Sequence, residues 1–290
     1  MRIPLAAVLL FFPLIPASVS AQQSTSPPAA APLVSDPQAV SLLQRSLIVQ
    51  VGTAQVTDVT LTGTARRIAG SDDESGTVAL RASAAGGSRI DLNFTTGNRS
   101  EIRNPSGIPL ADSVPPGVPE PTNPASQPVG AWSGTDGVLH GAPNHNLMTD
   151  PAWFFPVFTV ANLNASANYA LSYIGPETLN GQPVVQISAT QPSSDTRPGI
   201  AALAQHLTQM DIYLDSATLE PVALSFNTHP DNNALVDIAV SVVFSDYRAV
   251  NGVQVPFHVQ KYLNGGLVLD VQLSSATFNS GLAESTFAIQ

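Results

Sequence analysis

Two histidines lie five residues apart in a segment that also holds two asparagines. His140 and His145 are followed by Asp150, and two imidazoles with one carboxylate are a ligand set that a zinc ion accepts. Such sites normally lie on rigid elements whose hydrogen bonds orient the rings, whereas this segment has the composition of a loop. We therefore expect loop histidines here and no metal site.

Residue types that serve nucleophilic catalysis are scarce. The chain has no cysteine and no Gly-x-Ser-x-Gly segment, and its single lysine, Lys261, does not follow the Ser-x-x-Lys spacing. The acidic run Asp72-Asp73-Glu74 is predicted to be a solvated turn between strands, with weak calcium binding as the alternative. We predict no catalytic residue, no cofactor and no enzymatic activity. A hydrolase would require His140 or His145 to lie beside a serine and an acid.

The densest aromatic segment of the chain is formed by Trp153, Phe154, Phe155 and Phe158. We predict these four as ligand-binding residues, because an apolar lid over the concave face of a curved sheet would leave a pocket for acyl chains. The alternative is that the rings only fill the core beneath the sheet. Asp150 and Pro151 have the residue types of a helix start, while Pro156 is expected to prevent a long regular helix.

These side chains need elements to position them, and the first is a helix. Asp36 and Pro37 match an N-cap and a first helical position, and Gly52 is placed to end the helix. A second, short helical turn is predicted over 200–207. Between Asp36 and Gly52 apolar residues recur at helical spacing, namely Ala39, Val40, Leu42, Leu43, Leu47 and Val51.

The last 50 residues predict three antiparallel strands. They are joined by turns at Asn251-Gly252 and Asn264-Gly265-Gly266, because both central residues of a type I′ turn need positive φ. On the second strand one face carries the apolar residues Val253, Val255, Phe257 and Val259. Similar patterns predict about ten or eleven strands in all. Because strands follow one another in hairpins, the predicted fold class is α+β, with one strongly curved antiparallel sheet (an incomplete β-barrel) and covering helices.

The chain is expected to comprise one domain behind an export signal. Residues 1–21 combine Arg2, an apolar run and a small-residue cleavage site, which is typical of a signal peptide. Residues 22–35 are predicted to be a disordered linker, and 36–290 a single domain. Within it, 105–128 contains eight prolines and is predicted to be an irregular loop. Gly130 to Gly137 is expected to form a hairpin tip.

Composition narrows the classes of partner. Without Arg2 the chain has ten basic and 21 acidic residues, and nucleic acids and anionic membrane surfaces attract basic patches that this sequence lacks. No segment after the signal has the roughly 18 apolar residues of a membrane helix. The missing cysteine excludes a lipid anchor of the bacterial lipoprotein type and any disulfide. We expect a soluble protein that is periplasmic or secreted; the sequence gives no oligomeric state.

The order helix, strands, apolar helical segment, strands and Asn-Gly meander resembles the periplasmic lipoprotein-carrier (LolA-like) superfamily. The tail from Phe278 to Phe287 resembles the closing element of that superfamily, an Asn-x-Gly-Leu piece followed by an acidic-Ser pair and a buried Phe. The resemblance implies an incomplete barrel whose apolar concavity is closed by helices, in proteins that carry lipoproteins or sense acyl chains. The carriers latch their lid with a strand arginine, and four arginines lie on predicted strands, namely Arg66, Arg67, Arg81 and Arg89.

Two functional hypotheses follow. In the first, an apolar ligand, either a lipid or the acyl chain of a lipoprotein, binds between the curved sheet and the lid over 153–158 without a catalytic step. In the second, the core is fully packed, and the domain binds another cell-envelope protein through a sheet edge or the polar face.

Overall fold

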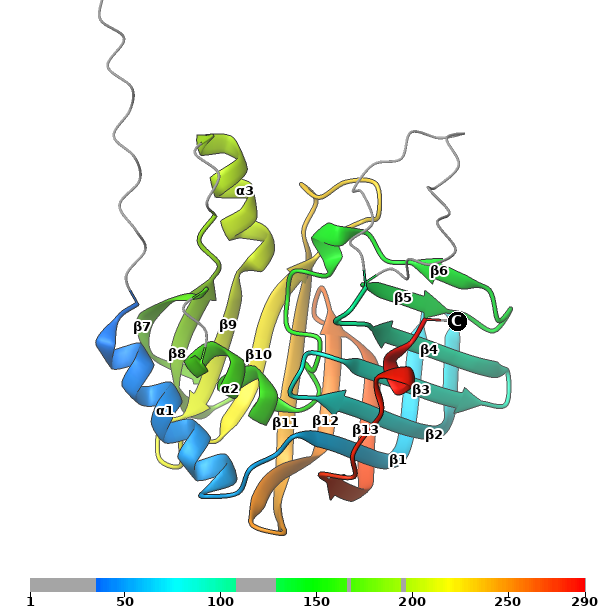
Figure 1. The fold of residues 1–290 in the computed structure, drawn as a ribbon, viewed down its shortest axis with the longest axis horizontal. Coiled ribbons are helices and arrows are strands. Elements are labelled where there is room, and N and C mark those ends of the chain that lie inside the picture. The colour runs from blue at the N-terminus through cyan, green and yellow to red at the C-terminus, as the bar shows by residue number, and fades with distance from the viewer. Residues whose placement is uncertain (1–34, 108–128, 166–167, 194–196, 290) are drawn as a thin grey trace, which may run out of the picture. The chain divides into compact units, whose positions relative to one another are not determined.

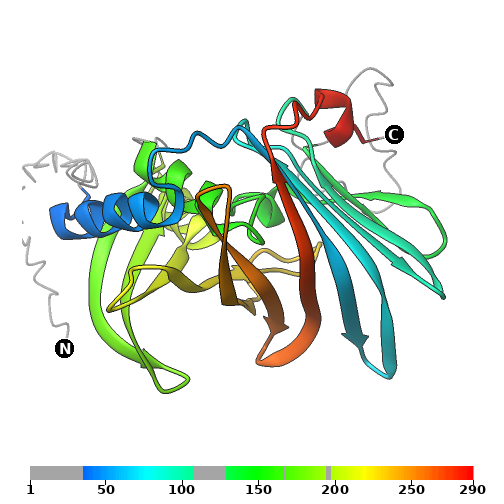
Figure 2. The same cartoon turned by 90° about the horizontal axis from the view of Figure 1, so that it is seen from below.

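The computed structural model describes residues 35–107, 129–165, 168–193 and 197–289, and its main feature is one curved antiparallel sheet. Over these residues the sheet has 13 strands, in the order β6-β5-β4-β3-β2-β1-β13-β12-β11-β10-β9-β8-β7. Two meanders are thus joined where the first strand pairs with the last, and β6 and β7 form the outer edges of an unclosed sheet (Figures 1 and 2). The predicted fold class is confirmed.

The strands agree with the predicted ones except that two more are present. The additional strands are β5 and β6, which form a hairpin. Of the expected hairpin tip over 130–137, Gly130–Ser133 forms β5, and only 134–137 lie in the connection between the two strands. The bounds are β1 (Asp58–Ala69), β2 (Asp72–Ser83), β3 (Ser88–Phe94), β4 (Gly97–Arg103), β5 (Gly130–Ser133), β6 (Leu139–Gly141), β7 (Ala170–Leu179), β8 (Gln182–Thr190), β9 (Met210–Asp215), β10 (Pro221–Thr228), β11 (Ile238–Val250), β12 (Val253–Leu263) and β13 (Gly266–Phe278).

Asparagine-glycine turns produce the meander at the end of the chain, as predicted. Asn251 and Gly252 have φ of 50° and 84°, and Asn264 and Gly265 have φ of 46° and 78°. Asparagine and glycine tolerate this left-handed region far better than other residues, so the turns are placed by residue type. The alternation on β12 is confirmed too, because Val253, Val255, Phe257 and Val259 are all buried.

Three α-helices accompany the sheet in the described residues: α1 (Pro37–Val51), α2 (Pro156–Ala165) and α3 (Pro198–Thr208). The Asp36 carboxylate accepts the Gln38 N–H at 2.7 Å, and Gly52 ends α1 with a φ of 56°, as expected. Pro156 was expected to limit a helix, but it begins α2, because proline at the first helical turn removes only an N–H that lacks a partner there. Helices α1 and α2 contact each other on the concave side of the sheet (Figures 1 and 2).

The tail after β13 is held by one carboxylate. Asp58, only 4% exposed, accepts the backbone N–H and hydroxyl of Ser280 at 2.8 Å each and the N–H of Gly281 at 3.0 Å. Asn279 of the tail also bonds the residue before Asp58, since its side-chain oxygen accepts the Thr57 N–H at 2.7 Å. We call these contacts of Asp58 and Asn279 the tail clasp. Beyond this clasp the tail buries the side chain of Phe287 in the core. The Asn-Ser-Gly motif therefore fixes the tail to the start of β1.

The acidic run predicted as a solvated turn lies at the start of β2, where Asp72 and Asp73 are exposed as expected and Glu74 is buried. Residues from Asp72 onward already pair with β1, and the sheet register places Asp73 opposite Ile68 and Glu74 opposite Arg67. Asp73 forms an ion pair with Arg66 at 2.6 Å, and Glu74 one with Arg67 at 3.1 Å. Two of the three acids are thus paired with arginines of the neighbouring strand. The predicted signal peptide, the linker up to residue 34 and most of the proline-rich loop (108–128) lie outside the described residues.

Candidate ligand-binding site

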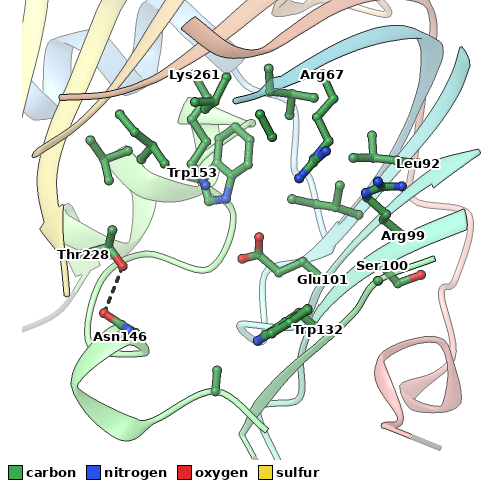
Figure 3. Close-up of a pocket in the computed structure, with 18 of the residues that line it drawn as sticks. Arg67, Leu92, Arg99, Ser100, Glu101, Trp132, Asn146, Trp153, Thr228 and Lys261 are labelled. Carbon is green, nitrogen blue, oxygen red and sulfur yellow. Dashed lines mark hydrogen bonds between the residues drawn. The ribbon is translucent and has the colours of Figure 1, made fainter. Parts of the chain in front are cut away.

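A cavity of about 880 Å³ lies between the sheet and the segment that precedes α2. Its lining is more apolar than polar, and one wall consists of inner-face side chains of the sheet, including Ile90, Leu92 and Leu269. Trp153 and Asn146 come from the opposite segment, and Trp132 of β5 lies at another side (Figure 3). The predicted concavity therefore holds open space beside a packed core.

The four aromatic residues predicted as ligand-binding divide between cavity and core. Trp153 lines the cavity while being only 4% exposed. The other three, Phe154, Phe155 and Phe158, are buried and are not among the lining residues. The Phe155 ring packs edge-on against Phe158 at 5.0 Å between centroids.

Cationic side chains are concentrated around this cavity in a chain whose net charge is −10. Among the described lining residues the anionic side chains are Glu101 and Asp231. The cationic ones are twice as many: Arg67, Arg99, Arg103 and Lys261.

Three of these cations have partners. Glu74 forms ion pairs with Arg67 at 3.1 Å and Arg99 at 3.0 Å, and it also accepts a hydrogen bond from the Thr96 hydroxyl. Thr96 and the arginines together lower the pKa of Glu74, with the hydroxyl as the first cause, against the opposing effect of burial. Arg103 donates to the Asn146 carbonyl at 2.9 Å, and its Nε lies 3.9 Å from Glu101.

Lys261 is the exception. Within the described part of the chain its ammonium has no hydrogen-bond or ion-pair partner, and it lies over the Trp153 ring, 4.3 Å from the centroid. Burial lowers the pKa of Lys261, while the Glu101 carboxylate opposes this shift. The inward position of Lys261 can be read from the strand alternation, which our prediction did not extend this far. The period-2 pattern of β12, continued beyond Val259, places Lys261 on the inner face.

Of the four strand arginines considered as a latch, one lines the cavity. Arg66 pairs with Asp73, and both side chains are about half exposed. Arg81 and Arg89 both pair with Asp91, at 2.7 and 2.9 Å. The remaining one, Arg67, is the lining residue, and it pairs with a strand neighbour rather than with a helix.

The histidines are placed differently from the prediction. His140 stacks on Trp132 at 4.3 Å between centroids, whereas the His145 ring bonds the Pro230 carbonyl at 3.1 Å, so the two have separate environments. The His258 ring contacts Asp270 at 2.8 Å on the neighbouring strand.

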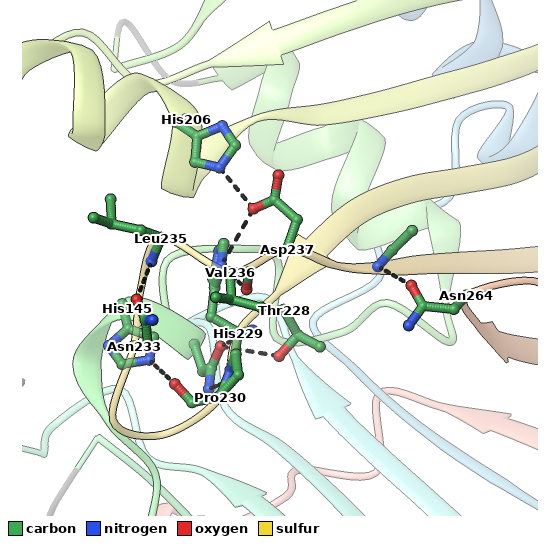
Figure 4. A network of polar contacts seen from close by, with 12 residues as sticks. His145, His206, Thr228, His229, Pro230, Asn233, Leu235, Val236, Asp237 and Asn264 are labelled. Atoms are coloured by element: carbon green, nitrogen blue, oxygen red, sulfur yellow. Dashed lines mark hydrogen bonds and ion pairs between the residues drawn. The ribbon is translucent and has the colours of Figure 1, made fainter.

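The other two histidines meet at one acid. His206 contacts Asp237 at 2.8 Å, and the buried His229 lies 3.4 Å from the same oxygen (Figure 4). Imidazole and carboxylate groups are also metal ligands, and the three ligand atoms lie within 4.8 Å of one another. Asp237 contacts His206 in the last turn of α3 and His229 in the loop before β11. These polar contacts between α3 and the loop account for the cluster without a metal ion.

Among the described residues no helix has the length and hydrophobicity to cross a membrane. No family model matches the chain, and no curated protein matches it either. Several solved structures are similar. The first is a LolA superfamily protein from Nitrosomonas europaea, with 12% identity and a TM-score of 0.48 over 87% of this chain and 97% of that one.

The second, from Vibrio parahaemolyticus, is described as an outer membrane lipoprotein-sorting protein domain, with 12% identity and a TM-score of 0.47 over 86% and 96%. A DUF1329 family protein from Desulfovibrio piger matches with 10% identity and a TM-score of 0.45 over 89% and 97%. All three structures are similar to this chain at 12% identity or less.

Proposed function

We propose that this chain binds an apolar ligand, the acyl chain of a lipid or lipoprotein, in the cavity beside Trp153 and performs no catalytic step. The observation that carries the proposal is the cavity itself, which is about 880 Å³ in volume, lies on the concave side of the sheet and has a lining more apolar than polar. Ligand pockets for small molecules fall in the range of about 300–1,000 Å³ and have mostly apolar walls.

Transfer of an acyl chain from water supplies the binding energy. Each buried CH₂ contributes about 0.8 kcal/mol, so a chain of ten methylenes yields roughly 8 kcal/mol before the cost of ordering it. Inner-face residues such as Leu92 and Leu269 offer the apolar contact surface. In this proposal residues 1–21 direct export and are removed, and the domain works in the periplasm or outside the cell.

A second candidate is an interaction module for another envelope protein. Its supporting observation is the hairpin of β5 and β6 at one sheet edge, where Trp132, Val138 and Leu139 are 42%, 51% and 37% exposed. An outer strand has unpaired backbone groups that can accept a strand from a partner.

Binding of a fluorescent fatty-acyl probe to delipidated protein tests the first candidate. Leu267→Trp narrows the cavity, so we expect probe affinity to fall by about tenfold or more, the equivalent of a few displaced methylenes. The matched control is Leu235→Trp, because Leu235 is 77% exposed and does not line the cavity.

Wild-type protein that binds no acyl probe, and from which native mass spectrometry recovers no lipid, would exclude the first candidate. Equal affinity of the Leu267→Trp and Leu235→Trp variants would show that acyl chains bind elsewhere.

A further inference from the structure

The cavity wall contains hydrogen-bond donors that have no acceptor in the described protein. The indole N–H of Trp153 and one guanidinium nitrogen of Arg99 are buried without a partner. The Lys261 ammonium also lacks a polar partner and contacts the face of the Trp153 ring. Figure 3 shows the Lys261 and Trp153 nitrogens at the same side of the cavity. A site with unmatched donors suits a ligand that brings acceptors.

Sheet register puts two of the cations in one row. Leu269 of β13 pairs with Arg67 of β1 on one side and with Lys261 of β12 on the other. Neighbouring strands are about 4.8 Å apart, so the backbones at Arg67 and Lys261 are roughly 10 Å apart with Leu269 between them. All three residues line the cavity, and Arg67 has an ion pair with Glu74, a carboxylate that it shares with Arg99. The cation of this row that has no ion-pair partner in the described residues is therefore Lys261.

An unpaired cation next to apolar side chains is costly, because it loses hydration without gaining a counter-charge. The lowered pKa of Lys261 agrees with this, since burial disfavours its charged form. Glu101 reduces the cost, but this carboxylate also lies 3.9 Å from Arg103 and is shared between the two cations. A ligand carboxylate at the ammonium would supply the missing charge and would accept the indole N–H.

We infer that the ligand is an acidic amphiphile, whose single anionic head group binds at Lys261 and the Trp153 N–H while its tail lies along Ile90, Leu92 and Leu269. This inference rests on the proposed function and names its ligand class. A charge-assisted hydrogen bond is stronger than a neutral one, so the head group gives selectivity over uncharged amphiphiles with the same tail. The tail contributes equally to both.

Paired probes with one tail and two head groups test the inference. For delipidated full-length protein at neutral pH, we expect palmitic acid to bind at least about tenfold more tightly than hexadecanol, the size of one charge-assisted hydrogen bond. Lys261→Met keeps an unbranched side chain of similar length and should abolish this preference, so that palmitic acid and hexadecanol bind the variant with affinities within about twofold of each other. Arg66→Met is the matched control, because it removes one cation at a half-exposed position outside the cavity lining.

Each outcome is decisive. If palmitic acid and hexadecanol bind the wild type equally, the inference of an acidic head group is wrong and the proposed acyl site stands. If neither probe binds, the proposed function fails as well. A preference that survives in Lys261→Met places the anion elsewhere. Should Lys261→Met not fold, Lys261→Arg and Trp153→Phe replace it. The arginine variant should keep the preference, and the phenylalanine variant, which lacks the N–H, should reduce it severalfold; the opposite pattern overturns the inference.

Discussion

Replacement of Asp58 by asparagine tests the clasp that holds the C-terminal tail. The carboxylate accepts three hydrogen bonds between 2.8 and 3.0 Å, from the N–H and hydroxyl of Ser280 and from the N–H of Gly281. Asparagine has nearly the same shape, but its NH₂ group would face a donor where the second carboxylate oxygen accepts. Asp58→Asn therefore changes hydrogen bonding with little change in packing.

The magnitude follows from the bonds that are lost. A hydrogen bond to a charged group contributes about 1.5–3 kcal/mol, and at least one bond to Asp58 becomes a donor–donor contact in Asp58→Asn. We expect the free energy of unfolding to fall by about 3 kcal/mol, which lowers Tm by roughly 6–12 °C in a domain of this size. The control is Asp36→Asn, since asparagine caps a helix about as well as aspartate.

The pH dependence of this loss has a defined sign. Burial opposes ionisation of Asp58, but the hydrogen bonds from Ser280 and Gly281 outweigh it and hold the pKa below the ordinary 3.8. A depressed pKa contributes stability that is present above pH 3.8 and is lost as pH falls through the folded-state value. Urea unfolding should show the full deficit of Asp58→Asn at neutral pH and a smaller one in stronger acid. Equal stability of variant and wild type at neutral pH, or a deficit that grows in acid, would refute the clasp.

Local patterns predicted most of the sheet because a strand and its turn are specified by neighbouring residues. The Asn251-Gly252 turn and the alternation from Val253 to Val259 together determine β11, β12 and their shared hairpin. The pairing of β1 with β13 has no such signal, since its partners, such as Val59 and Phe278, lie at opposite ends of the domain. The short strands β5 and β6 offer too few residues for a periodic pattern, which explains the lower predicted strand number.

The candidate site was predictable only in part. Aromatic density indicated the segment around Trp153, and the structure places that residue at the cavity. The cationic side chains that line the cavity were not predicted. Lys261 continues the inner-face alternation of its strand, and a lysine at such a buried position is uncommon. Other features depend on contacts between distant segments, such as Glu74 with Arg99 or His206 with Asp237, which spacing in the sequence cannot reveal.

Two further substitutions test the strand pairing and a buried acid. A methyl group in Gly63→Ala would lie 2.1 Å from the Gln272 backbone oxygen, so we expect the free energy of unfolding in urea to fall by about 1–3 kcal/mol. The control Gly199→Ala lies in α3 with open space around it and should be neutral or slightly stabilising. Equal urea midpoints for Gly63→Ala and wild type would contradict the β1–β13 register. Burial raises the pKa of Asp150 above 3.8, so at neutral pH its ionisation costs stability, although the Ala152 N–H partly offsets this cost. Asp150→Asn can keep the Ala152 bond at 2.7 Å without a charge, and it loses only the long 3.4 Å contact from the Asn162 amide. In urea unfolding the variant should therefore be more stable than wild type at neutral pH, and this gain in stability should disappear as pH falls below 3.8. A variant less stable than wild type at neutral pH would show that the carboxylate is needed in its charged form.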